Sequence, residues 1–257
     1  MITRLVRGGL AAALAVTTLT VAAAAVATAA PTAVATTVSG PNVTVTQAGN
    51  YPIFPVDNTN FSVTWKSTGT ADVTGVTRLT VDLPPGLTTT GALMYSTPND
   101  YTFTQTVSPD GRRLEAVFTG ARAPGRSDFM KVQVSSHGTR PSGVITVTAA
   151  NKDDADPSDN VSRYLLGSGL QAPVTPAAPA VTALAPSTGP AAGGTAVTIT
   201  GTGLTNGFAL FGNTSASASC TDTACVVTAP TGSGTVPVTL VTPGGSAATP
   251  TAFTYTP

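Results

Sequence analysis

The sequence predicts an all-β protein built from two β-sandwiches in tandem, which are joined by a linker rich in proline and alanine. Of its 257 residues, 9% are charged and 5% aromatic, whereas 26 are glycine and 21 are proline. This composition suits strands and turns better than helices. Short runs of alternating apolar and polar residues recur between turn signals, and no window shows a helical period. The composition also breaks near the middle of the chain, over residues 167–180.

Residues 1–29 have the pattern of a secretory signal peptide. Arg4 and Arg7 form a short positive region, Leu10 to Val26 an apolar core, and Ala27-Thr28-Ala29 a cleavage site of small residues. We expect cleavage after Ala29, or after Ala30 as a poorer option. The alternative is that the apolar run is retained as an anchor, since an alanine-rich helix of this length can sit in a bilayer.

Removal of the signal peptide leaves ten basic and twelve acidic residues, a net charge of −2. This charge gives no electrostatic reason to bind nucleic acid or an anionic membrane. The rest of the chain has no second apolar segment long enough to span a bilayer, and no cysteine follows the signal region as a lipid attachment point. We therefore expect a secreted, extracellular protein, which is either free or associated with the cell surface.

The first predicted sandwich covers residues 32–166. In the run from Phe61 to Lys66, apolar residues alternate with Ser62, Thr64 and Lys66, so that each kind takes one face of a strand. The turn Ser108-Pro-Asp-Gly111 predicts a hairpin between the runs on either side of it. The residues expected on the buried faces are Phe61, Val63, Trp65, Thr77, Leu79, Val81, Leu83, Tyr101, Phe103, Leu114, Ala116, Phe118, Met130, Val132 and Val134, followed by the run Val144 to Thr148.

The order of motifs in this region resembles the immunoglobulin-like repeats of unknown function found in many bacterial surface proteins. The resemblance lies in residues 61–72, in Leu83-Pro-Pro-Gly-Leu87 and in Asp154-Ala-Asp-Pro-Ser-Asp-Asn160. Such repeats usually carry Asn where Lys66 or Ser67 stands here, so the match is partial. The resemblance implies a spacer or adhesive role and no reaction.

Some residues of this region have more than one interpretation. Asp153, Asp154, Asp156 and Asp159 offer carboxylate oxygens that suit Ca²⁺, but their spacing is not that of an EF-hand, and a solvated turn explains them equally well. We therefore predict no metal site. Trp65 is expected in the core because it alternates with Phe61 and Val63; a sugar-stacking platform is the alternative. The scattered cations are expected on a solvated face, with an acidic partner as the alternative: Arg112, Arg113, Arg122, Arg126 and Lys131.

Residues 167–180 contain three prolines and no alternation, which predicts a semi-extended linker. Residues 181–257 then form the second predicted sandwich. Its motifs are Val181 to Pro186, the bends Gly189-Pro190 and Gly193-Gly194, a strand over Thr195–Thr200, the step Gly201-Thr-Gly203, Phe208 to Gly212, Val226 to Gly234, Val236 to Ser246 and Phe253-Thr-Tyr255. This order resembles an IPT/TIG domain, an immunoglobulin-like β-sandwich. Alternation independently places Val236, Val238 and Leu240 on one face.

Cys220 and Cys225 are the two cysteines of the sequence. An exported chain with an even number of cysteines usually pairs them, and the intervening Thr221-Asp-Thr-Ala224 suits a hairpin loop. We predict a structural disulfide. A redox motif would need closer spacing, and a zinc site would need two further ligands.

The sequence predicts no enzyme and no cofactor. The one histidine, His137, follows Ser136 directly, and that spacing does not provide a nucleophile with a spatially placed base and acid. No Gly-x-Ser-x-Gly elbow or phosphate-binding loop is present. A hydrolase that uses two of the carboxylates is the remote alternative.

A structural or adhesive protein is the preferred class, with a protein or a cell-wall glycan as the partner. Exposed strand edges would offer pairing to a protein. A carbohydrate-binding module, the alternative, should present a patch of exposed aromatic rings on one sheet face, with Tyr51, Tyr95 and Tyr101 as candidates. The sequence leaves open the partner, the oligomeric state and the use of the sequons at Asn42, Asn60, Asn160 and Asn213.

Overall fold

The computed structural model describes residues 37–48, 59–95 and 101–257. The chain divides into two compact units, residues 1–35 and 36–257, and the second contains every described residue. The predicted signal peptide and Tyr51 lie outside the described residues. The described fold is all-β apart from one short 3₁₀ helix, η1 (Pro157–Asp159).

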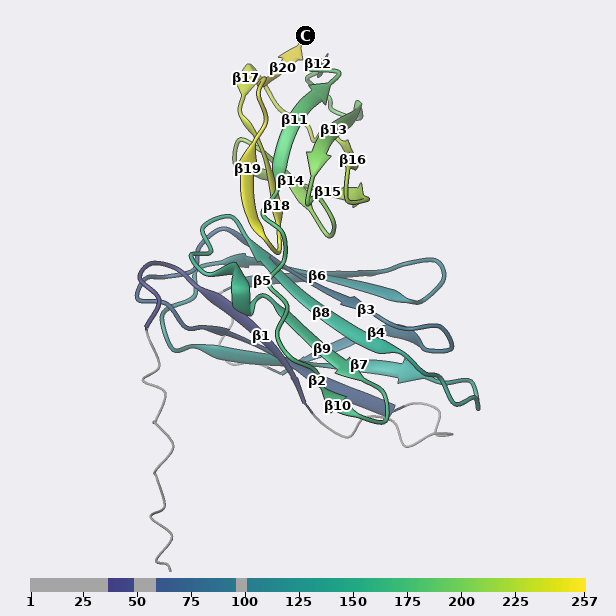
Figure 1. Ribbon diagram of the computed structural model, residues 1–257. Helices are drawn as coiled ribbons and strands as arrows, with labels where there is room; N and C mark the ends of the chain where they lie inside the picture. The colour runs from purple at the N-terminus through teal and green to yellow at the C-terminus, as the bar shows by residue number, and fades with distance from the viewer. Residues whose placement is uncertain (1–36, 49–58, 96–100) are drawn as a thin grey trace, which may run out of the picture. The chain divides into compact units, whose positions relative to one another are not determined.

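Two antiparallel sheets form the first sandwich (Figure 1). The first sheet has the order β1 (Val43–Ala48), β2 (Thr59–Ser67), β7 (Ser127–Ser135) and β4 (Thr88–Tyr95). The second sheet has the order β10 (Gly169–Leu170), β9 (Val161–Leu165), β8 (Val144–Asn151), β3 (Val76–Asp82), β6 (Arg113–Gly120) and β5 (Tyr101–Val107).

The predicted hairpin between β5 and β6 is confirmed. The two strands pair from Tyr101 with Gly120 to Val107 with Leu114. Asp110 caps the turn, because its Oδ1 accepts hydrogen bonds from Ser108 Oγ at 2.5 Å and from the Arg112 N–H at 3.1 Å. Gly111 has a φ of 67°, in the left-handed region that a side chain disfavours. The turn residues therefore act as their chemistry predicts.

The core of the first sandwich lies between its two sheets. Phe61, Val63 and Trp65 of β2 are buried on one face, as their alternation predicts. The facing sheet contributes buried apolar residues at alternate positions of β3, β6 and β8. The ring centre of Trp65 lies 4.6 Å from that of Phe118. Aromatic rings at this separation stabilise a core beyond the area they bury.

Two strands of the first sheet, β4 and β1, were not predicted from the sequence. β4 contains a bulge between Thr89 and Gly91, where its register against β7 shifts by one residue. Gly91 adopts a φ of 128° at this bulge. β1 alternates only over Val43, Val45 and Gln47, which are buried. Gln47 is a polar residue on the buried face, and its side-chain amide nitrogen, Nε2, donates to the carbonyls of Ile145 and Ser162.

The second sandwich also has two sheets (Figure 1). The larger has the order β11 (Ala180–Ala185), β13 (Ala196–Thr202), β16 (Ala224–Thr228), β15 (Thr214–Cys220), β14 (Phe208–Phe211), β18 (Val238–Thr242) and β19 (Gly245–Ala248). The smaller has the order β12 (Thr188–Pro190), β20 (Phe253–Thr256) and β17 (Thr235–Val236).

Short alternating strands fill the core of the second sandwich. Val238 and Leu240 are buried, as the alternation predicts, and so are Val197 and Ile199 of the predicted strand Thr195–Thr200. Phe253 packs edge-on against Phe211, with ring centres 5.3 Å apart. β12 runs parallel to β20, so the Gly189-Pro190 bend carries the chain onto the smaller sheet. Among the residues described, no helix combines the length and the apolar character needed to cross a membrane.

Within the unit of residues 36–257, Arg78 of β3 is buried and contacts two residues of the second sandwich, Phe208 and Ser217. Its guanidinium carbon lies 4.6 Å from the ring centre of Phe208, and its Nη2 donates to Ser217 Oγ at 3.3 Å. Burial lowers the pKa of Arg78, and the charge of Glu115 opposes that effect. The buried cation is therefore compensated by an aromatic face, a hydroxyl and a carboxylate.

Candidate functional site

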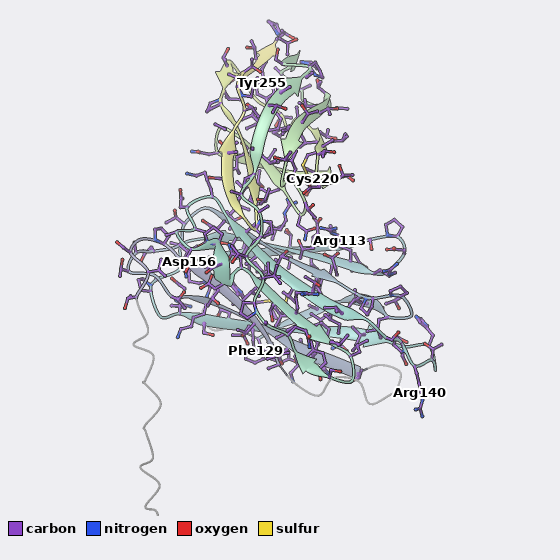
Figure 2. All side chains as sticks on the ribbon, viewed as in Figure 1. Arg113, Phe129, Arg140, Asp156, Cys220 and Tyr255 are labelled. Atoms are coloured by element: carbon purple, nitrogen blue, oxygen red, sulfur yellow. A yellow bond between two sulfur atoms is a disulfide. The ribbon has the colours of Figure 1, made fainter. Side chains whose placement is uncertain are left out.

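Cys220 and Cys225 form a disulfide with an S–S distance of 2.03 Å (Figure 2). The two residues stand directly opposite each other, one at the end of β15 and one in β16. The hairpin loop between them is closed by the Thr221 N–H, which donates to the Ala224 carbonyl at 2.8 Å. Cys225 is buried in the core, so the bridge fastens an outer hairpin to the interior.

The aspartate loop is anchored to the start of β1. Asp154 Oδ1 accepts from the Val43 N–H, and Asn42 Nδ2 donates to Asp159 Oδ2 at 3.0 Å. Asp156, labelled in Figure 2, caps η1 by accepting from the Ser158 N–H and hydroxyl. Asp154, Asp156 and Asp159 therefore accept hydrogen bonds from Val43, Ser158 and Asn42, which a freely solvated turn would not require. Asp153 pairs with Lys152 on the surface.

Burial raises the pKa of Asp159 to about 6; the hydrogen bond from Asn42 opposes the rise, and the charges of Asp154 and Asp156 add to it. Burial also raises the pKa of Asp154. In the described part of the chain, no three or more His, Cys, Asp or Glu side chains are grouped so that they could hold a metal ion. The geometry assigns these carboxylates to loop anchoring.

His137 lies in a turn after β7 and has a φ of 51°. Its Nε2 is 2.8 Å from Thr88 Oγ1, and its backbone N–H donates to Ser135 Oγ. Ser136, its neighbour in sequence, is buried. Among the described residues, the His137 ring thus contacts a threonine and no carboxylate. A catalytic histidine would need such a carboxylate to orient it.

The predicted solvated face is wrong for Arg122. Arg122 is 4% exposed, its guanidinium lies over the ring of Trp65, and it pairs with the buried Asp128. The other cations remain nearer the surface, where Arg113 lies 3.5 Å from both Asp82 and Glu115. Sequence separation explains the error, since Trp65 and Arg122 are brought together only by the pairing of distant strands.

Exposed apolar residues gather on the outer face of β4 and β7. Leu93 is 53% exposed, Tyr95 42% and Phe129 39%. Strand register places Tyr95 opposite Phe129 and Leu93 opposite Lys131. The rings of Tyr95 and Phe129 are parallel within 1°, with centres 5.3 Å apart, and Lys131 Nζ lies 4.9 Å from the Tyr95 ring centre. We call these four residues the Tyr95–Phe129 patch; Phe129 is labelled in Figure 2.

The patch contains one of the three predicted tyrosines. Tyr51 lies outside the described residues, and Tyr101 belongs to β5 without a described side chain. Phe129 was not predicted, although the sequence holds a signal for it. Met130 and Val132 mark the buried face of β7, so Phe129 lies on its solvent-facing side, where a large aromatic residue is unusual.

The four sequons differ in access. Asn42 and Asn160 are buried, and the side chain of Asn42 donates to Thr68 Oγ1 and Asp159. Asn213 is exposed in the turn between β14 and β15, and Asn60 is half-buried in β2. The folded protein therefore leaves only the latter two accessible to a modifying enzyme.

Comparison with known proteins places one part of the chain in a family. Residues 179–255 match the family model of the IPT/TIG domain. No curated protein matches the sequence.

Solved structures give weak matches. They include a Bacteroides thetaiotaomicron protein of unknown function (15% identity, TM-score 0.28, covering 31% of this chain and 22% of that one). The extracellular region of plexin A4 also matches (17% identity, TM-score 0.29, covering 83% of this chain and 18% of that one). So does the BSP domain of a biofilm-associated protein (9% identity, TM-score 0.27, covering 86% of this chain and 53% of that one). This chain thus spans about a fifth of the first two chains and about half of the third.

The family match covers the region that the sequence motifs single out, from the lead strand β11 to the closing strand β20. Its strands form the two sheets and the small core described above. Residues 179–255 of this all-β chain are therefore an IPT/TIG domain.

Proposed function

We propose that this protein is a secreted, non-catalytic structural or adhesive protein that acts outside the cell or at its surface. Residues 32–166 and 181–257 serve as its two immunoglobulin-like modules. Residues 167–180 connect them, and within this connection Gly169 and Leu170 (β10) pair with β9 of the first module. The pattern of a signal peptide in residues 1–29 and the Cys220–Cys225 disulfide support an oxidising, extracellular setting.

The Tyr95–Phe129 patch is the observation that carries the adhesive role. Three exposed apolar side chains lie side by side on one sheet face, whereas exposed apolar residues on soluble proteins are usually scattered. Aromatic residues are enriched where proteins bind other proteins. Lys131 at the edge of the patch favours a partner with an acidic rim.

A protein partner suits this patch better than a glycan does. A sugar ring stacks on an open aromatic face, but Tyr95 and Phe129 cover one face of each other and Lys131 lies near the Tyr95 ring. The pair offers ring edges and apolar side-chain surface. Binding to a cell-wall glycan is the second candidate, favoured by the same exposure of two aromatic rings on one sheet face.

The test compares binding of the exported chain with that of a Tyr95→Ser/Phe129→Ser variant, on the surface of producing cells and on a glycan array. Val226→Ser is a matched control, since Val226 is 51% exposed on β16. We expect saturable, protease-sensitive binding to cells that the double variant loses and the control keeps. Binding to glycans alone would favour the second candidate, and equal binding by all three proteins would contradict the role of the patch.

A further inference from the structure

Two of the four described edge strands of the first sandwich, β4 and β10, are protected against pairing with another chain. Gln105 bonds to the free edge of β4 at Ala92: its Oε1 accepts from the Ala92 N–H at 2.8 Å, and its Nε2 donates to the Ala92 carbonyl at 3.1 Å. The bulge at Gly91 further distorts this edge. β10, at one end of the larger sheet, is only two residues long. Short, bulged or covered edges are ways in which proteins prevent strand pairing with another chain.

In the part of the chain that the structure describes, β5, at the other end of that sheet, has none of these protections. It is seven residues long, Tyr-Thr-Phe-Thr-Gln-Thr-Val, with no charge, no proline and no break in its register against β6. Thr102, Thr104 and Thr106 are exposed. Among the described residues, hydrogen bonds to the backbone of Thr102–Val107 come from β6 alone.

Hydrogen bonding at the hairpin shows which groups of β5 face outward. The Ser108 N–H donates to the Arg113 carbonyl at 2.9 Å, and the Arg113 N–H donates to Ser108 Oγ at 2.9 Å, so Ser108 stands at a position of the ladder whose backbone N–H points toward β6. Such positions alternate along an antiparallel ladder, which places Thr102, Thr104 and Thr106 in hydrogen-bonded pairs with β6. Phe103, Gln105 and Val107 therefore direct their backbone N–H and carbonyl groups away from β6, toward the open edge.

The open edge is complementary to a second copy of itself. If two β5 strands pair antiparallel about a two-fold axis at Gln105, Phe103 faces Val107 of the other copy and Thr104 faces its Thr106. Aromatic with β-branched pairs and threonine pairs both stabilise antiparallel strands. The strand carries no charge that would repel its copy. Phe103 and Val107 pack against the core but are only partly buried, so a second strand would cover them further.

We propose that two copies of this protein associate through antiparallel pairing of their β5 strands, which joins their larger first-sandwich sheets into one continuous sheet. A single strand pair buries less than the roughly 1,200 Å² of a standard stable interface, so the dimer is weak and forms at high protein concentration. The axis at Gln105 leaves its side chain free to keep its contact with Ala92.

Sedimentation of the exported chain over a wide concentration range tests the association. We expect the mass to rise from monomer to dimer, and Thr104→Lys to abolish the rise because it puts a charge beside the axis in each copy. Thr119→Lys is the matched control: Thr119 is exposed on the same face of the sheet, one strand in from the edge. A monomer at every concentration would overturn the proposal, as would a dimer that Thr104→Lys leaves intact.

Amide hydrogen exchange locates the interface. The N–H groups of Phe103, Gln105 and Val107 should exchange more slowly as the concentration rises, whereas those of Thr104 and Thr106, already bonded to β6, should not change. A different result is that the protein dimerises while the exchange rates of these three N–H groups stay independent of its concentration. That result would place the contact elsewhere and refute pairing through β5.

Discussion

The guanidinium carbon of Arg122 lies 3.4 Å from the ring centre of Trp65, and the same guanidinium forms an ion pair with Asp128. Asp128 stands directly opposite Trp65 in the pairing of β7 with β2. All three side chains are at least 96% buried. Arg122 is held in place by backbone hydrogen bonds in both directions with Val73. A buried ion pair thus lies beside the largest ring of the core.

Asp128→Ala should destabilise the protein by about 3–5 kcal/mol, because it leaves Arg122 buried without its counter-charge. Urea denaturation followed by Trp65 fluorescence measures the effect. Asp72→Ala is the control, since Asp72 is exposed and its loss should change the unfolding free energy by less than about 0.5 kcal/mol. Equal effects of the two substitutions would contradict an energetic role for the buried pair.

Loss of the disulfide should lower the stability of the IPT/TIG domain by about 2 kcal/mol, the loop entropy released when Cys220 and Cys225 are no longer joined. The measurement is denaturation of the native protein with and without a reductant. The Cys220→Ala/Cys225→Ala variant should be insensitive to the reductant. A native protein that is equally stable in both conditions would disprove this role.

The protein should become more stable as the pH falls from 7 toward 4.5. The pKa of Asp159 in the folded state, about 6, lies above that of an unfolded aspartate, so protonation favours the folded state and this contribution is lost as the pH rises through 6. The raised pKa of Asp154 acts in the same direction.

Asp159→Asn should therefore reduce this pH dependence and stabilise the protein at pH 7, by on the order of 1 kcal/mol after allowance for solvent around a half-buried carboxyl. Thermal denaturation at several pH values measures both effects. Asp110→Asn is the control. Hydrogen bonding to Ser108 lowers the pKa of Asp110, so removing this carboxyl should not reduce the gain in stability between pH 7 and 4.5. The idea fails if Asp159→Asn keeps the full pH dependence of the native protein.

Gln105→Ala should expose the edge of β4 at Ala92. The variant loses two hydrogen bonds, which together contribute about 1–3 kcal/mol, and the Ala92 N–H should exchange with solvent faster. Gln133→Ala on the outer face of β7 is the comparison. Unchanged exchange at Ala92 would mean that the Gln105 side chain does not protect this edge.

Period and turn chemistry predicted much of the fold. Phe61, Val63 and Trp65 alternate because one face of β2 is buried, and Ser108 to Gly111 form the turn that their backbone preferences dictate. β4 was missed because its bulge breaks the alternation at Gly91. β19 was missed because Gly-Ser-Ala-Ala carries almost no hydrophobic contrast.

Local sequence determined the all-β class, the core faces of the longer strands and the IPT/TIG motifs, since these depend on neighbouring residues. Only the tertiary structure decided that Arg122 is buried over Trp65, that Tyr95 stacks on Phe129, and that β5 stands at the end of its sheet. The physical reason is that strand order joins residues more than thirty positions apart, and no periodicity within a strand records which strand lies beside it.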